Sequence, residues 1–307
     1  MSDLLDILFK FDYFGCLLIG FPLNIILIIL IIFKTPKEMK THSLILIQSC
    51  VIDILLLIIQ LLVQGYYLLD TEGNSFVIFP NGIMLYLMKD FDPIICHTVF
   101  AFLLYLGDLN LHGLCVQFVY RYLILNRNMK INFRRYLYIF SIAIFLTLIH
   151  ILHLFFFLIP YTNGGINYFD NFNKTLPFIQ YKTEKMTFLT NLPIILIEIS
   201  AYLIIIICGF KMVKYVNLNT NFDGNLKRLN KQLTRVLIIL AVIPFIDQSG
   251  LVFLSSSTKI NNTTTNIIRI LIYIFFHLTP VFNPIICILT NTPYRNAIFK
   301  RSQINPQ

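Results

Sequence analysis

The chain of 307 residues is 57% hydrophobic and only 13% charged, with a mean hydropathy of +0.75. Soluble domains are nearer half apolar and a quarter charged, so this composition excludes an ordinary water-soluble protein and predicts one that lies in lipid. The net charge of +9 would fit a nucleic acid or a membrane surface as partner, and its distribution along the chain decides between them.

Seven apolar segments are long enough to cross a bilayer, whose hydrocarbon core of about 30 Å needs about 20 helical residues. Lipid offers no partner for backbone polar groups, so each segment is predicted to be a helix. No repeat or linker divides the chain, which predicts an all-α membrane protein with a single seven-transmembrane domain over residues 1–307. The predicted spans are residues 13–33, 43–69, 94–125, 136–160, 188–210, 235–257 and 265–290.

Positive residues fix the expected direction of the bundle, because lysine and arginine flank membrane spans on the cytoplasmic side. They concentrate in segments 34–42, 126–135, 211–235 and 291–307 and are sparse in the other loops. The amino terminus is therefore predicted outside and the carboxyl terminus inside, and the charge predicts no nucleic-acid partner. N-x-Ser/Thr glycosylation sequences fall in the predicted outer loops, at Asn173, Asn261 and Asn262.

Polar residues within the spans are costly, which makes them candidates for function. Asn24, Asp53, Asn110 and Asn283 lie at similar predicted depths, near the middle of the bilayer. One carboxylate and three amides can form a network or hold a small cation with water. The alternative is four unrelated hydrogen bonds between helices.

The third span carries polar residues on two faces. Asn110, Gln117 and Arg121 are spaced by seven and four residues and share one face. Asp108 and His112 are four apart on another face and could pair with each other. The candidate ligand-binding residues lie in the outer halves of the spans. They are Asp108, Glu198, Asp247 and His277.

Two features suggest moving parts and a docking surface. Pro244 and Pro284 interrupt helical backbone bonding and predict kinks, either static or hinge-like. A basic stripe repeats every four residues at Lys227, Lys231 and Arg235. It can attract anionic lipid, or form part of the rim of a groove for a partner helix. The other basic residues assigned to this surface are Arg121, Arg134, Arg135 and Arg228.

Several stretches, in chain order, resemble the nematode serpentine chemoreceptors within the rhodopsin-like G-protein-coupled receptors. They are "FKTPKEMKTHSLILIQSCVID", "FVYRYLILNR", "NLKRLNKQLTRVLIILAVIP" and "PVFNPIICILTNTPYR". Among these receptors the Str-type group is most similar, and "IFPNG" before the third span is similar to its class delta, Srd.

The resemblance implies a multi-pass plasma-membrane receptor, in the ciliary membrane of chemosensory neurons. It would bind a small-molecule odorant or pheromone and activate a heterotrimeric G protein, without a cofactor. Arg121 and Tyr122 match the family's Arg-Tyr pair, which implies contact with the G protein. Tyr120 replaces the usual acidic residue, so if Arg121 is a switch, the tyrosines on either side are the first candidates for its resting partner. Cys96 matches a cysteine that usually forms a disulfide, but segment 161–187 lacks its partner.

Two other functions compete with the receptor. His150 and His153 are three apart and could serve an intramembrane metal hydrolase, although no H-E-x-x-H motif is present. Acidic residues in the spans could instead line the path of a ligand-gated channel or a transporter. The receptor is the preferred interpretation, and no enzymatic activity and no bound metal are predicted.

Overall fold

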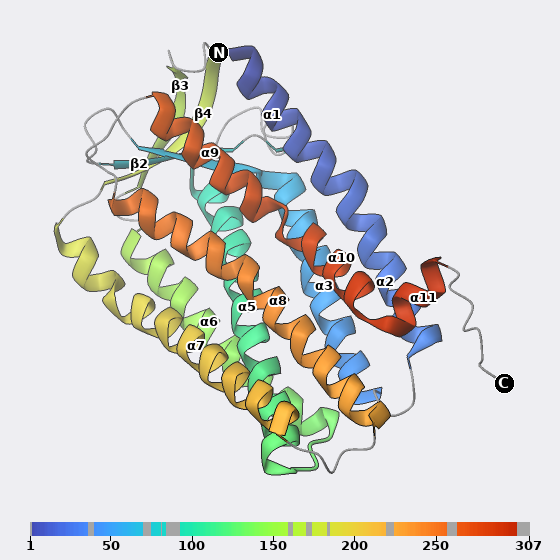
Figure 1. Ribbon diagram of the computed structural model, residues 1–307. Coiled ribbons are helices and arrows are strands. Elements are labelled where there is room, and N and C mark those ends of the chain that lie inside the picture. The colour runs from blue at the N-terminus through green and yellow to red at the C-terminus, as the bar shows by residue number, and fades with distance from the viewer. Residues whose placement is uncertain are drawn as a thin grey trace.

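The structure is a computed structural model that describes residues 2–35, 40–69, 75–80, 82–83, 93–158, 162–169, 174–182, 185–218, 224–256 and 263–299. Long helices form an elongated bundle (Figure 1), and a small sheet closes one end of it. The first helical stretch is α1 (Ser2–Gly15), the π-helical turn η1 (Cys16–Gly20) and α2 (Phe21–Lys34). The other helices are α3 (Lys40–Val63), α5 (Pro93–Arg127), α6 (Phe133–Leu158), α7 (Lys185–Leu218), α8 (Gly224–Ser256), α9 (Thr263–His277), α10 (Thr279–Thr290) and α11 (Thr292–Phe299).

The bundle is apolar on its outer surface as well as in its core. In α2, Leu27 and Ile31 are buried while Ile29 and Phe33 face outward. Within the described residues, five helical stretches are long and apolar enough to cross a membrane, and the bent pair α9–α10 makes a sixth. A surface of this kind is stable in lipid and not in water.

The second span ends earlier than its predicted boundary of residue 69. Gln64 has φ of 39°, in the left-handed region that a continuing helix excludes. The chain therefore leaves α3 at Val63, and Gly65–Leu69 forms a strand instead. An apolar run alone did not distinguish the end of a helix from the start of a strand.

A four-stranded antiparallel sheet, which the sequence did not predict, covers one end of the bundle. Its strands are β1 (Gly65–Leu69), β2 (Ser75–Pro80), β3 (Thr162–Phe169) and β4 (Lys174–Lys182), in the order β1-β2-β4-β3. Ile78 of β2 pairs with Ile179 of β4. Both side chains are buried in one apolar cluster with Cys96 of α5, which is a free thiol. The loop that lacks a disulfide partner is thus held by strand pairing and apolar contact.

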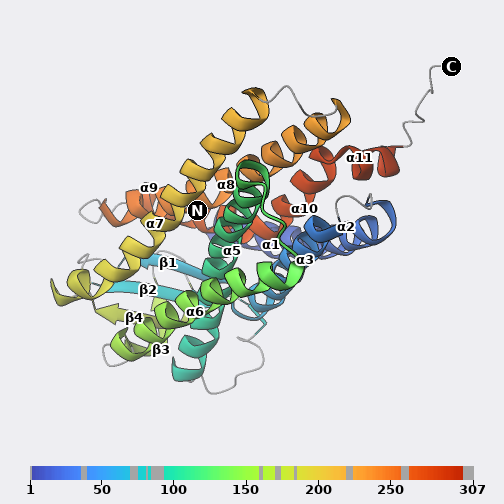
Figure 2. The same ribbon diagram turned by 90° about the horizontal axis from the view of Figure 1, so that it is seen from below.

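The two ends of the bundle differ (Figures 1 and 2) and are called the hairpin end and the basic end. The hairpin end carries the sheet, and the basic end carries residues 126–135, residues 224–235 and α11. The short helix α11 lies at the basic end, with Ile298 and Phe299 exposed.

The last span is bent by 52° between α9 and α10, at Leu278. Pro280 lies in the first turn of α10, where its missing N–H is tolerated and its ring prevents continuation of the preceding helix. Pro284, where a kink was predicted, lies inside α10, and the break between the two helices falls six residues earlier. The break at Leu278 therefore lies next to Pro280, which was not among the predicted kink positions.

Candidate functional site

A buried carboxylate joins three helices in the middle of the bundle. Asp53 of α3 is 2% exposed and accepts hydrogen bonds from Asn110 of α5 at 2.8 Å and Asn283 of α10 at 2.9 Å. A second contact from the Asn283 amide to the other carboxylate oxygen measures 3.1 Å. Three of the four residues of the expected polar layer are therefore bonded to one another.

Asn24, the fourth residue of that layer, binds backbone instead. Its side-chain amide donates to the carbonyl oxygens of Pro280 at 2.9 Å and Gly20 at 3.0 Å. It therefore ties the first span to the start of α10, at a carbonyl that has no donor four residues later because Pro284 lacks an N–H.

A small cavity of about 30 Å³ adjoins Asp53 and is lined by Asn110, Gln117, Asn283 and Pro244. Gln117 donates to Ser49 at 2.8 Å on the wall of this cavity. The volume suits one water molecule or a small ion. A buried carboxylate held only by amide donors is costly when charged, so a cation in this cavity would offset that cost.

Arg121 lies buried at the basic end of α5, with 6% of its surface exposed. Its guanidinium donates to the side-chain oxygen of Asn230 on α8 at 3.2 Å. The partner of Arg121 in this structure is thus an amide across the bundle, and not one of the neighbouring tyrosines. Tyr120 packs edge-on against Tyr136 of α6 instead, with ring centroids 5.5 Å apart.

A second contact holds the same end of α8 from the other side. The Gln232 amide donates to the carbonyl oxygen of Thr290 and, at 2.7 Å, to the hydroxyl of Thr292. Asn230 and Gln232 therefore connect the start of α8 to α5 and to the α10–α11 junction. In both contacts a single side chain donates to an uncharged acceptor. Such hydrogen bonds can break and form with new partners without disrupting a helix.

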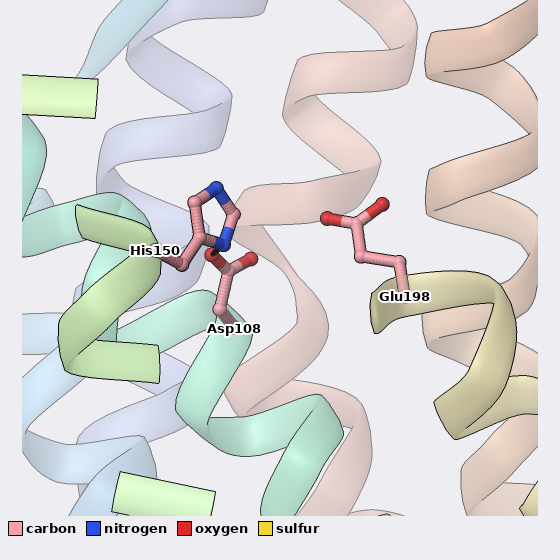
Figure 3. A group of neighbouring side chains, drawn as sticks. All are labelled: Asp108, His150 and Glu198. Atoms are coloured by element: carbon pink, nitrogen blue, oxygen red, sulfur yellow. Dashed lines mark ion pairs between the residues drawn. The ribbon is translucent and has the colours of Figure 1, made fainter. Parts of the chain in front are cut away.

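A second polar cluster lies between α5, α6 and α7 (Figure 3). Asp108 pairs with His150 at 2.9 Å, and the Glu198 side chain of α7 extends toward them. One ligand atom from each of the three residues lies within 4.8 Å of the other two. His112, which could have paired with Asp108, instead contacts Thr147 of α6 at 2.8 Å.

The donor set of this cluster is chemically versatile. An imidazole nitrogen and two carboxylate oxygens are ligand types that zinc accepts, and the same atoms can hold a ligand ammonium or hydroxyl group. Asp108 and Glu198, two of the predicted ligand-binding residues, are thus brought together, with His150 as a partner that was assigned only to the hydrolase alternative.

His277, another predicted ligand-binding residue, belongs to a different cluster near the hairpin end. It contacts Asp12 of α1 at 2.7 Å, and both side chains are buried. Asp12 also accepts hydrogen bonds from Tyr66 of β1 at 2.7 Å, Gln64 at 3.4 Å and Cys16 at 3.5 Å. This arrangement ties the first span, the last span and the sheet together, and His277 is one of its members.

The remaining predicted residues are half-buried, exposed, or outside the part of the chain that the structure describes. Tyr122 is half-buried beside Lys211, whose ammonium lies 5.6 Å from the ring centroid. Asn173, Asn261 and Asn262 lie outside the described residues, as do the side chains of Lys227 and Asp247. Among the basic residues predicted to form the docking surface, those described as exposed are Arg134, Arg135, Arg228, Lys231 and Arg235.

Sequence reasoning missed Asn230, although a signal was available. Leu233, Leu237 and Leu240 mark the buried face of α8, and Asn230 continues that face by one turn. An amide on the apolar face of a helix is expected to find a partner. Asp12 gave no comparable signal, because it stands in an acidic segment that resembled a solvent-exposed terminus.

Comparisons with known proteins agree with this geometry. The family described as "Serpentine type 7TM GPCR chemoreceptor Srd" matches residues 9–300. Among solved structures, squid rhodopsin is similar with a TM-score of 0.67 and 14% identity, over 95% of this chain and 84% of the rhodopsin chain. No curated protein matches. The chain has a rhodopsin-like seven-transmembrane fold, and it belongs to the Srd family of serpentine G-protein-coupled chemoreceptors.

Proposed function

We propose that this chain is a chemosensory receptor that binds an extracellular small molecule and activates a heterotrimeric G protein. The observation that carries this proposal is the family match, which covers residues 9–300 and therefore almost the whole chain. In this proposal the amino terminus is outside, the basic end faces the cytoplasm, and the receptor lies in the ciliary plasma membrane of sensory neurons.

The ligand anchor in this proposal is the cluster of Asp108, His150 and Glu198. It joins three helices, and its polar atoms converge within 4.8 Å. Polar groups of this kind, held in an apolar surrounding, orient a small ligand more than they add raw affinity. A cationic or hydrogen-bond-donating group on the odorant would bind the two carboxylates.

The switch in this proposal is the bond between Arg121 and Asn230. While it is formed, it holds the basic end of α8 against α5. A ligand that favours a second arrangement of the bundle shifts the population toward it only by its difference in affinity for the two states. A neutral amide partner makes this bond weaker than an arginine–carboxylate pair, so a modest ligand affinity is sufficient.

The polar layer around Asp53 would modulate the same equilibrium. It connects α3, α5 and α10, and the adjoining cavity of about 30 Å³ accepts a sodium ion in this proposal. A cation bound there stabilises the state that forms the cavity and opposes states that close it.

The deciding experiment expresses the full chain with a panel of volatile and water-soluble odorants and measures G-protein activation. We expect an odorant-dependent signal that is lost in Arg121→Ala, with surface delivery equal to wild type. Arg134→Ala, which removes an exposed cation at the same end, should lose only part of it. A ligand-evoked current that needs no G protein would contradict the receptor and favour a channel.

A further inference from the structure

An apolar groove runs along the outer surface of the bundle between α7 and α8. It has a volume of about 440 Å³, within the range of ligand pockets, which is roughly 300–1,000 Å³. Tyr202 of α7 and Phe245 of α8 close one end of it, with their rings edge-on and the centroids 5.9 Å apart. Gly209 carries no side chain, so the ring of Phe118 forms part of the groove wall.

A second, more polar hollow of about 260 Å³ continues the groove toward the basic end. The two share Val213 of α7 and Ile238 of α8 in their walls. The second hollow adds the exposed cations Lys231 and Arg235, together with Asn217. The combined surface is therefore apolar along most of its length and positively charged at one end.

The dimensions of this surface match one leaflet of a bilayer. The apolar part spans Tyr202 to Val213 on α7, which is about 16 Å at 1.5 Å per helical residue. Half of a hydrocarbon core of about 30 Å is about 15 Å. With the closed end of the groove at the bilayer midplane, the cations would lie at the depth of the phosphates of that leaflet, and basic pockets between transmembrane helices bind anionic headgroups.

We propose that the α7–α8 groove is a binding site for one anionic glycerophospholipid. An acyl chain lies in the apolar part, and the phosphate binds Lys231 and Arg235. A lipid fits this site better than a free phosphate does, because a free phosphate would leave the apolar groove unfilled. A zwitterionic lipid has no net charge, because its ammonium group offsets its phosphate, whereas an anionic lipid keeps a net negative charge that the two cations attract.

The test uses the full chain in detergent and native mass spectrometry, with dioleoyl phosphatidylserine and dioleoyl phosphatidylcholine as probes. We expect one phosphatidylserine per chain, bound more tightly than phosphatidylcholine. In K231Q/R235Q its affinity should fall on the order of 10- to 30-fold, because each cation near a lipid surface contributes a few-fold. The control K130Q/R134Q removes the same two charge types from exposed positions outside the groove.

A second pair of variants tests the acyl chain. Val242 lines the groove and is 48% exposed, while Val51 on α3 is 47% exposed and lies outside it. Val242→Trp should reduce binding of both lipids, and Val51→Trp should not. Glycerophosphoserine, the headgroup without acyl chains, should fail to compete.

Three results would overturn the proposal. The first is equal loss of phosphatidylserine in K231Q/R235Q and K130Q/R134Q, which would indicate attraction to total charge. The second is full competition by glycerophosphoserine or inorganic phosphate, which would indicate an anion site without a lipid. The third is a dimer of the chain that Val242→Trp abolishes, which would assign the groove to a second copy.

Discussion

The two ends of the bundle are built from different interactions. At the hairpin end, four strands are joined through backbone hydrogen bonds, and a carboxylate with no exposed surface, Asp12, binds four side chains from neighbouring elements. At the basic end, the described contacts between α8 and its neighbours include single side-chain hydrogen bonds, such as Arg121–Asn230 and Gln232–Thr292. The first kind of contact is costly to break, and the second is readily exchanged.

This difference suits a receptor in which one end keeps its shape and the other changes. Buried ionic contacts resist rearrangement because a separated charge remains buried without a partner. At the basic end Arg121 is held by one hydrogen bond to a neutral amide, which costs less to break than four contacts to one buried carboxylate, so two arrangements of that end can be closer in stability. Substitutions at the two ends should therefore differ in their cost to stability.

The largest effect is expected at Asp12. Asp12→Ala should lower the free energy of unfolding by about 3–5 kcal/mol, because it leaves His277, Tyr66 and Gln64 buried without their acceptor. Thermal unfolding of the detergent-solubilised chain measures the loss. In the double variant with His277→Ala the loss should be less than additive. Additive losses would mean that the two side chains act independently.

A smaller loss is expected at Tyr66, which donates one hydrogen bond to the same carboxylate. Tyr66→Phe should cost about 1.5–3 kcal/mol, the usual range for a hydrogen bond to a charged group. The control Tyr138→Phe changes a tyrosine that is 74% exposed and should be neutral. If Tyr66→Phe left the free energy of unfolding unchanged, Asp12 would not have its proposed role at the hairpin end.

The contribution of Tyr66 should also depend on pH. Burial, and then the charge of Asp12, raise the pKa of Tyr66 well above the ordinary value of 10.0. The folded protein therefore holds this proton more tightly than the unfolded chain. The stabilisation is complete below pH 10 and declines as the pH rises above it. The difference in stability between wild type and Tyr66→Phe should shrink in that range, and a difference that grew would contradict this assignment.

A sodium-dependent effect is expected at Asp53, between the two ends. A cation at ten times its Kd stabilises the folded state by about 1.4 kcal/mol. Sodium should therefore raise the melting temperature of the wild type more than potassium does, and Asp53→Asn should abolish the difference. The same variant should weaken the sodium sensitivity or the efficacy of an agonist in the signalling assay. Unchanged behaviour in both measurements would leave the three bonded residues as a structural contact only.

The sequence predicted the helices well, because apolar runs of 20 or more residues in lipid have few alternatives. It did not predict the sheet, since the pairing of Ile78 with Ile179 joins segments a hundred residues apart and neither loop shows a strong strand pattern. The Asp53 layer was found because its residues are polar at equal depth. The Asp12 cluster was not, because its members come from the ends of their elements.

The partners of charged side chains were the least predictable part of the candidate site. Helical spacing within one span suggested Asp108–His112, but the helix packing places His150 opposite Asp108. Likewise, adjacent tyrosines were expected beside Arg121, whereas α8 supplies Asn230. Spacing reports the face of a helix, and the neighbour across that face depends on how the helices pack.

The most direct test of the account measures ligand-free nucleotide exchange on a G protein by the purified receptor and by Asn230→Ala. Loss of a hydrogen bond to a buried guanidinium shifts a two-state equilibrium by about tenfold or more. We predict that Asn230→Ala raises basal exchange several-fold, while Asn230→Asp, which pairs Arg121 with a carboxylate, lowers it. Asn132→Ala, at an exposed position of the same end, should match wild type. Basal exchange that is unchanged or reduced in a folded Asn230→Ala protein would contradict the proposed switch.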